Sequence, residues 1–248
     1  MITSAHNVAL NGEIKEKAGE SANMVTLYDV AIQDFLISEI TKQYPDAFFI
    51  AEEKENSADA LMRKYCFIID PIDGTTNFIH EYRHSCISLA LFSYGKPIFS
   101  AIYDPYQNEM FSAVKDGGAF LNGKRIQVSK RDMKHSLVAF GTAPYYKKQF
   151  GDVTFDLCRE LFIKCCDVRR CGSAALDLAY LAAGRNDIFF EYLLSPWDIA
   201  AGALLITEAG GIITDANGKS IDFSAPCSVV AATPTVYDSM LDTVKNHR

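Results

Sequence analysis

The pattern of turn residues divides this chain into two halves with different strand arrangements. Between residues 86 and 129, short apolar segments alternate with turns such as Asp116-Gly117 and Asn122-Gly123. Asp-Gly and Asn-Gly favour the tight turns that join neighbouring antiparallel strands. The segments CISLALF, PIFSAIYD and EMFSAV therefore predict an antiparallel meander.

After Leu137 the pattern changes to strands that alternate with helices. Such alternation is typical of a layered α/β arrangement. The predicted strands lie at residues 137–141, 168–172, 187–194, 210–215 and 228–232. The predicted helices lie at residues 152–164, 173–183 and 197–210, and a last helix starts near Pro234.

A predicted helix at residues 29–44 and two predicted strands, at residues 47–50 and 65–70, precede the meander. No low-complexity tract or flexible linker separates the two patterns. We therefore predict one compact unit over residues 1–248. Its N-terminal half, residues 1–135, is α+β with the meander, and its C-terminal half, residues 136–248, is α/β.

Composition limits the partners of the protein. The net charge of −7 argues against nucleic-acid binding, which needs clustered Lys and Arg. No stretch approaches the roughly 20 apolar residues of a membrane helix, and the first residues lack a signal-peptide pattern. The seven cysteines form no C-x-x-C pair. We expect reduced thiols in a cytoplasmic protein, without a disulfide frame or a cysteine zinc site.

Two carboxylates follow an apolar strand-like run in the string DPIDGTTNF, residues 70–78. Pro71 fixes one φ angle, and Gly74 permits backbone geometry that other residues avoid. Such a turn can direct the carboxylates of Asp70 and Asp73 and the carbonyl of Ile72 toward one point. Hard cations such as Mg²⁺ prefer oxygen ligands of this kind. The alternative is a turn in which both Asp side chains cap backbone N–H groups.

Two further acidic strings allow a similar pair of interpretations. Glu52 and Glu53 follow the apolar run AFFI and can equally lie in a solvated loop. Asp198 belongs to SPWD, where Ser195 and Pro196 provide good chemistry for a helix start. The same position is a strand-to-helix junction, where α/β proteins often bind ligands. The residues alone leave both interpretations open.

Taken together, three strings resemble the signatures of the inositol monophosphatase family in order and spacing. They are AEE at residues 51–53, DPIDGTTNF at residues 70–78 and WDIAAGALLITEAGG at residues 197–211. This family comprises Mg²⁺-dependent, lithium-sensitive phosphatases related to fructose-1,6-bisphosphatase. The resemblance implies an α/β fold of the sugar-phosphatase type, an α-β-α-β-α sandwich. From the resemblance we also expect a homodimer.

The resemblance further implies a set of metal ligands. Glu52, Asp70 and the carbonyl of Ile72 would hold one Mg²⁺. Asp70, Asp73 and Asp198 would hold a second, and a third, weaker ion would depend on Glu52. The family usually has a longer N-terminal segment, and Lys17 is a candidate for the basic residue of its loop near the third ion.

The resemblance also implies roles in catalysis and phosphate binding. Gly74 and Thr75 would present backbone N–H groups to the phosphate. Thr75 would pair with Asp29 to orient and deprotonate the attacking water, with Glu52 also counted among the catalytic residues. Without the resemblance, Asp29 has the alternative role of a helix-capping acid.

Two further matches concern the alcohol part of the substrate. The string of Gly172, Ser173 and Ala174 resembles a G-[ST]-A motif that contacts the sugar ring. Glu191 lies where the family places an acceptor for sugar hydroxyls. The alternatives are a plain helix N-cap for Ser173 and a surface acid for Glu191.

The reaction that the resemblance implies is Mg²⁺-dependent hydrolysis of a small sugar or polyol phosphate monoester. The expected substrate is inositol 1-phosphate, and a metal-activated water attacks without a covalent phospho-enzyme. Fructose-1,6-bisphosphatase activity is the alternative. Its second phosphate would need a basic pocket, with the candidates Lys164, Arg169, Arg170 and Arg185.

A non-catalytic relative that binds sugar phosphates or a protein partner is a further alternative. Such a relative would be expected to lose metal-site residues, and this chain has them all. His80 and His84 have the i, i+4 spacing of a helical zinc pair. The residues between them do not match the metalloprotease pattern, so we expect no zinc pair there.

Overall fold

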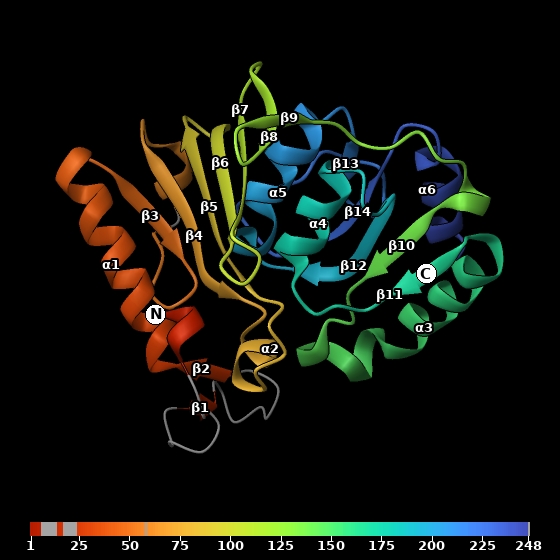
Figure 1. The fold of residues 1–248 in the computed structure, drawn as a ribbon, viewed down its shortest axis with the longest axis horizontal. Coiled ribbons are helices and arrows are strands. Elements are labelled where there is room, and N and C mark those ends of the chain that lie inside the picture. Colours follow the sequence, from red (N-terminus) through yellow and green to blue (C-terminus); the bar gives the residue numbers. More distant parts are fainter. Residues whose placement is uncertain (6–13, 17–23, 58, 248) are drawn as a thin grey trace.

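The computed structural model describes residues 1–5, 14–16, 24–57 and 59–247, so Lys17 lies outside the described residues. Figure 1 shows five layers, in the order helix, sheet, helices, sheet, helices. Helix α1 (Leu27–Gln43) forms the first layer. The α-β-α-β-α arrangement predicted from the sequence is confirmed.

The first sheet has seven strands in the order β3-β4-β5-β6-β7-β8-β9. Strands β3 and β4 are parallel, and each later pair is antiparallel, so the predicted meander is confirmed. Tight turns at Gly95, Asp116-Gly117 and Asn122-Gly123 connect its strands, in agreement with the turn chemistry. The strands are β3 (Phe48–Ala51), β4 (Cys66–Asp73), β5 (Cys86–Ser93), β6 (Lys96–Asp104), β7 (Glu109–Val114), β8 (Gly118–Leu121) and β9 (Lys124–Ile126).

The second sheet has five strands in the order β11-β10-β12-β14-β13. Strand β10 pairs in parallel with β11 and β12, and β14 pairs antiparallel with β12 and β13. Strands β10, β11 and β12 can be parallel because a helix connects each to the next along the chain. The strands are β10 (Leu137–Phe140), β11 (Asp167–Arg169), β12 (Ile188–Leu194), β13 (Ile212–Thr214) and β14 (Cys227–Ala232).

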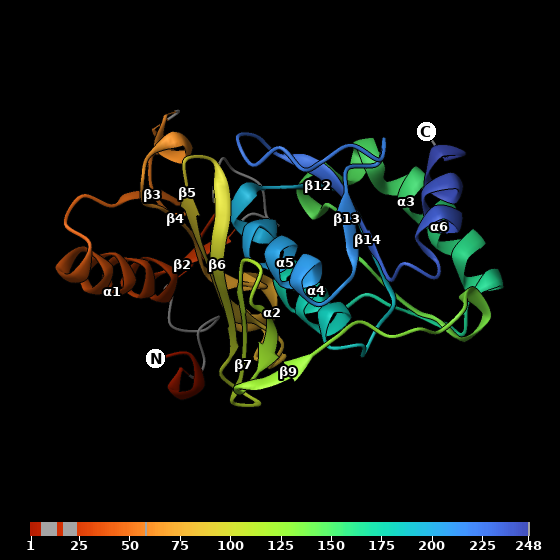
Figure 2. The ribbon, with the colours of Figure 1, turned by 90° about the horizontal axis from the view of Figure 1, so that it is seen from above.

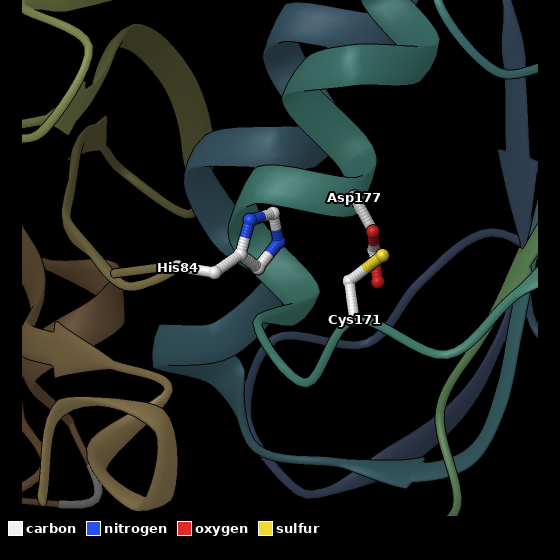
Figure 3. Close-up of side chains that lie close together, drawn as sticks. All are labelled: His84, Cys171 and Asp177. Carbon is white, nitrogen blue, oxygen red and sulfur yellow. The ribbon is translucent and has the colours of Figure 1, made fainter. Parts of the chain in front are cut away.

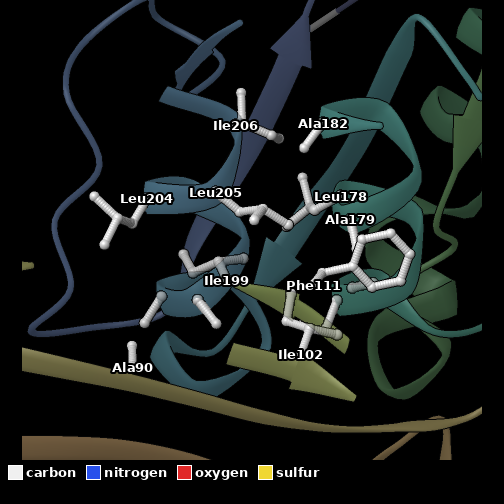
Figure 4. Packing of buried hydrophobic residues seen from close by; sticks show 14 of the residues in the cluster. Ala90, Ile102, Phe111, Leu178, Ala179, Ala182, Ile199, Leu204, Leu205 and Ile206 are labelled. Atoms are coloured by element: carbon white, nitrogen blue, oxygen red, sulfur yellow. The ribbon is translucent and has the colours of Figure 1, made fainter. Parts of the chain in front are cut away.

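Helices α4 (Ala174–Ala182) and α5 (Pro196–Glu208) form the middle layer, as Figure 2 also shows. Both are apolar around most of their circumference, which suits burial between two sheets. Figure 4 shows Leu178 of α4 beside Leu205 of α5, with Ile102 of the first sheet close by. A Cβ at Gly202 would lie 2.6 Å from Leu178 Cδ1, so this glycine lets the helices approach closely.

The outer helices cover the two remaining faces. On one side, Leu36, Ile37 and Ile40 of α1 pack against buried residues of β3 and β4. On the other side, α3 (Lys147–Lys164) and α6 (Tyr237–Lys245) pack on the second sheet. Among the helices that the structure describes, none combines the length and the apolar character needed to cross a membrane.

Several element boundaries differ from the prediction. Helix α3 begins at Lys147, because a 3₁₀ turn at Pro144–Tyr146 leads directly into it. Strand β11 ends at Arg169, before the chain turns at Gly172 with a φ of +91°. Helix α6 begins at Tyr237. The short pair β1 (Ile14–Glu16) and β2 (Met24–Thr26) was not predicted.

Candidate metal and phosphate site

A cavity of about 590 Å³ lies where the end of β4 meets β12 and the starts of α4 and α5. Its walls therefore come from both sheets and from the middle helices. Almost every residue that the sequence analysis selected lines it. These are Glu52, Asp70, Ile72, Asp73, Gly74, Thr75, Gly172, Ser173, Ala174, Glu191 and Asp198. Asp29 is not part of the lining, but it lies behind Thr75.

An irregularity in β4 brings two carboxylates to the same cavity. Residues three apart in a regular strand point to opposite faces. Between Asp70 and Asp73 the register with β5 shifts, at the point where Pro71 lacks a backbone N–H group. Gly74 then turns the chain with a φ of +89°, and a Cβ there would lie 3.1 Å from the carbonyl oxygens of Gly172 and His84. A glycine is therefore required at this turn.

Asp70, Asp73 and Asp198 form a cluster in which one carboxylate oxygen of each lies within 4.8 Å of the others. Asp70 and Asp73 are buried, at 2% and 7% exposed. Burial raises the pKa of all three, and the charges of Glu52 and the neighbouring aspartates raise the pKa of Asp70 further. Close buried carboxylates repel one another unless a cation neutralises them. This oxygen-only donor set fits a hard divalent cation such as Mg²⁺.

Two of these aspartates are fixed by helix starts. Asp73 Oδ2 accepts hydrogen bonds from Ser173 Oγ at 2.5 Å and from the backbone N–H of Ala175 at 2.7 Å. Asp198 Oδ2 accepts one from the backbone N–H of Ser195 at 2.7 Å and completes the capping box of α5. Asp198 therefore both caps α5 and lines the cavity.

Thr75 connects the cavity to Asp29. Its Oγ1 lies 3.3 Å from Asp29 Oδ1 and 3.0 Å from the carbonyl oxygen of Ile72. Asp29 is fully buried, and its Oδ2 accepts hydrogen bonds from Thr26 Oγ1 at 2.5 Å and from the Thr26 backbone at 2.8 Å. Asp29 thus caps α1 and reaches Thr75 with its other oxygen.

Glu191 is buried, at 7% exposed, which excludes the interpretation as a surface acid. Its Oε1 accepts a 2.8 Å hydrogen bond from the backbone N–H of Ala143. Burial raises the pKa of Glu191 to about 7, against the opposing effects of that hydrogen bond and of Arg170. A Cβ at Gly141 would lie 1.8 Å from Glu191 Oε2, so the carboxylate packs directly on the glycine backbone.

Comparison with known proteins identifies the family. The sequence model described as "Inositol monophosphatase family" matches residues 1–248. The chain belongs to the inositol monophosphatase family.

Similar proteins in this family include "Nus factor SuhB" of Escherichia coli (strain K12), 41% identical over 227 residues, with coverage of 91% of this chain and 84% of that protein. Among solved structures, the extragenic suppressor protein suhB from Bartonella henselae has a TM-score of 0.88 at 32% identity, over 97% of this chain and 92% of that one. The Thermotoga maritima IMPase has a TM-score of 0.84 at 32% identity, over 95% and 89%.

Of the four basic residues considered for a second phosphate, only Arg170 lines the cavity of this family member. Its Nη2 donates a 3.0 Å hydrogen bond to Thr142 Oγ1. The others point to different partners: Arg169 pairs with Asp167, Arg185 pairs with Glu109, and Lys164 pairs with Glu160. These four residues therefore do not form the basic pocket that the bisphosphatase alternative would need.

Sequence reasoning missed Tyr145 and Asp177, which also line the cavity. Tyr145 is 42% exposed as a whole, but desolvation of its hydroxyl and the charges of nearby acids, Glu52 first among them, raise its pKa. Asp177 is 3% exposed and lies in the first turn of α4. An acid within the apolar string AALDLAYLA was a usable signal for Asp177. Tyr145 follows a turn and carried no comparable signal.

Proposed function

We propose that this protein hydrolyses a small sugar or polyol phosphate monoester with Mg²⁺, and that inositol 1-phosphate is its substrate. The observation that carries the proposal is the convergence of Asp70, Asp73 and Asp198 on one cavity, beside the pair formed by Thr75 and Asp29. Family membership supports a phosphatase. The substrate and the metal are our inference from the shape and chemistry of the site.

The residues that would hold Mg²⁺ are Glu52, Asp70, Asp73, Asp198 and the carbonyl of Ile72. When bound, Mg²⁺ would lower the pKa of the attacking water and stabilise the negative charge on the leaving oxygen. The chain itself would orient the water. The Thr75 hydroxyl would donate its proton in a hydrogen bond to Asp29 Oδ1, so its oxygen is free to accept a hydrogen bond from that water. As the water loses a proton to Thr75, the hydroxyl proton of Thr75 would pass to the buried carboxylate of Asp29.

Other residues would bind the phosphate and the alcohol. The backbone N–H groups of Gly74 and Thr75, at the turn between β4 and α2, would donate hydrogen bonds to the phosphate. Ionised Glu191 would accept hydrogen bonds from polyol hydroxyls, with its position fixed by Gly141 and Ala143. Gly172 and Ala174 would border the ring. Ser173 would act indirectly, because its hydroxyl is already bonded to Asp73.

We infer that residues 1–248 act as one unit. The proposed metal ligands come from both halves of the chain, since Asp70 and Asp73 lie in β4 of the first sheet and Asp198 lies in the first turn of α5. We also infer a cytoplasmic protein, because all seven cysteines are free thiols. The net charge of −7 favours a small-molecule partner over nucleic acid. A homodimer stays a prediction.

The name of the relatives favours a second candidate function. "Nus factor SuhB" does not describe a phosphatase. A non-catalytic role on the same scaffold, such as binding a protein partner, therefore stays an alternative. It does not exclude hydrolysis, because the cavity and a partner surface can coexist.

The test is phosphate release by the purified protein, with and without Mg²⁺, from inositol 1-phosphate and fructose 1,6-bisphosphate. We expect Mg²⁺-dependent release from inositol 1-phosphate and slower release from the bisphosphate, since Arg170 alone among the candidate cations lines the cavity. Faster release from the bisphosphate would favour the bisphosphatase alternative. No release by a folded protein that binds Mg²⁺ would show that the substrate is wrong, and no Mg²⁺ binding would favour the non-catalytic role.

A further inference from the structure

Three side chains with different donor atoms meet outside the carboxylate cluster (Figure 3). His84 lies between α2 (Thr75–Ile79) and β5, Cys171 lies between β11 and α4, and Asp177 lies in the first turn of α4. One donor atom of each residue lies within 4.8 Å of the other two. The three residues come from separate segments, so no short motif in the sequence indicates this cluster.

We propose that His84, Cys171 and Asp177 form a binding site for a thiophilic divalent cation, with Zn²⁺ as the best match. Imidazole nitrogen, thiolate sulfur and carboxylate oxygen are the three ligand types of protein zinc sites. Mg²⁺ prefers an all-oxygen set, so the two clusters would select different ions. Three protein ligands leave the fourth tetrahedral position open for water or another ligand.

The imidazole of His84 is the strongest indication of a ligand. Its Nε2 is buried and has no hydrogen-bond partner within the part of the chain that the structure describes. In Figure 3 the ring faces Cys171 and Asp177. A buried polar atom without a partner is rare and calls for a ligand, an ion or a water. Burial also lowers the pKa of His84 and so favours the neutral imidazole, which is the form that binds metals.

Charge balance also favours a cation. The Cys171 sulfur and a carboxylate oxygen of Asp177 lie within 4.8 Å of each other. Burial raises the pKa of Cys171 to about 11 and raises that of Asp177 as well, because neither negative charge is well solvated there. A divalent cation would neutralise a thiolate and a carboxylate together, and the neutral imidazole adds no charge.

The backbone that carries two of the ligands is already fixed. Asn77 Nδ2 donates hydrogen bonds to the carbonyl oxygens of both His84, at 2.7 Å, and Cys171, at 2.8 Å. Metal bonds of about 2.0–2.3 Å require the donor atoms to draw closer together. His84 and Cys171 are only partly buried, so their side chains can rotate toward an ion. The site is therefore largely preformed.

The proposal can be tested with Co²⁺ as a spectroscopic substitute for Zn²⁺, in the presence of saturating Mg²⁺. A thiolate bound to Co²⁺ gives a near-ultraviolet charge-transfer band that carboxylates alone cannot give. We expect this band in the wild type, its displacement by Zn²⁺, and its loss in Cys171→Ser. Competition with a chelator should show that Zn²⁺ binding weakens more than about tenfold in His84→Gln, since even outer-shell changes cost about 10–100-fold.

Cys166→Ser is the matched control, because Cys166 is an exposed free thiol close to the same segment. Its band and its Zn²⁺ affinity should equal those of the wild type. Circular dichroism establishes that each variant is folded. The absence of a thiolate band in folded wild-type protein would overturn the proposal. A band that persists in Cys171→Ser, or that disappears in Cys166→Ser, would also overturn it.

Discussion

Ser173 Oγ donates a 2.5 Å hydrogen bond to Asp73 Oδ2, and this contact joins the end of β4 to the start of α4. The same hydroxyl accepts a 3.4 Å hydrogen bond from the backbone N–H of Leu176 as the N-cap of α4. One buried side chain thus begins a helix and orients a proposed metal ligand. The orientation of Asp73 therefore depends on how the middle layer packs against the first sheet.

Ser173→Ala should weaken Mg²⁺ activation more than it weakens the fold. Asp73 would keep the Ala175 N–H as a donor but lose its hydroxyl partner. Changes to groups that orient metal ligands typically cost about 10–100-fold in metal affinity or activity, whereas loss of an N-cap costs about 1 kcal/mol. The measurement is activity as a function of Mg²⁺ concentration. Ser173→Thr keeps the hydroxyl and should restore most of the lost affinity.

Asp73→Asn should reduce turnover by at least about a hundredfold, because removal of a single electrostatic catalytic group often costs this much. The free energy of unfolding without Mg²⁺ should not fall, because the substitution removes the repulsion that the charge of Asp73 exerts on Asp70 and Asp198. Steady-state kinetics and denaturant unfolding would measure the two effects. Asp34→Asn, an exposed site on α1, is the control. Near-normal turnover in Asp73→Asn would refute the proposed ligand set.

Glu191 should make stability depend on pH. Its pKa of about 7 in the folded protein lies above the ordinary value for Glu, so the folded state binds more protons than the unfolded state between those two values. The contribution of Glu191 to stability therefore decreases as pH rises through this range, by a few kcal/mol at most. Denaturant unfolding of the metal-free protein at several pH values should show a smaller decrease in Glu191→Gln. Identical pH profiles for both proteins would contradict this prediction.

Gly141→Ala should raise KM for inositol 1-phosphate several-fold or more, because the new Cβ would occupy the position of Glu191 Oε2 and displace the carboxylate. Gly151→Ala is the matched control. A Cβ there meets nothing within 4 Å, and the residue lies within α3. That variant should keep its KM and gain about 0.5–1 kcal/mol in stability. Equal KM values for the two variants would argue against Glu191 as a substrate contact.

The sequence was most informative where a local rule determines the structure. Asp-Gly and Asn-Gly turns predicted the meander, and the SPWD string predicted the start of α5. Hydrophobic periodicity does not report the shift in register at Pro71, which depends on pairing with β5. This shift brings Asp70 and Asp73 to one cavity. The sequence therefore predicted which residues belong to the site but not how they are arranged in space.

Contacts between distant segments were not predictable in the same way. The close approach of Gly141 to Glu191 depends on the pairing of β10 with β12. The meeting of His84 with Cys171 depends on Asn77, which holds two loops from different halves of the chain. The roles proposed for Asp29 and Glu191 came from the family resemblance, since each residue has an ordinary structural alternative when judged from the sequence alone.

The placement of α4 and α5 between the sheets has a consequence for how this protein tolerates change. The carboxylates from β4 and those from the middle helices keep their spacing only while the two sheets hold their alignment. A bulky residue at Gly202, in the contact with Leu178, would force the two helices apart. We expect such a variant to lose the proposed phosphatase activity while it keeps its overall fold, because the distances between the carboxylates in the cavity depend on the alignment of the layers.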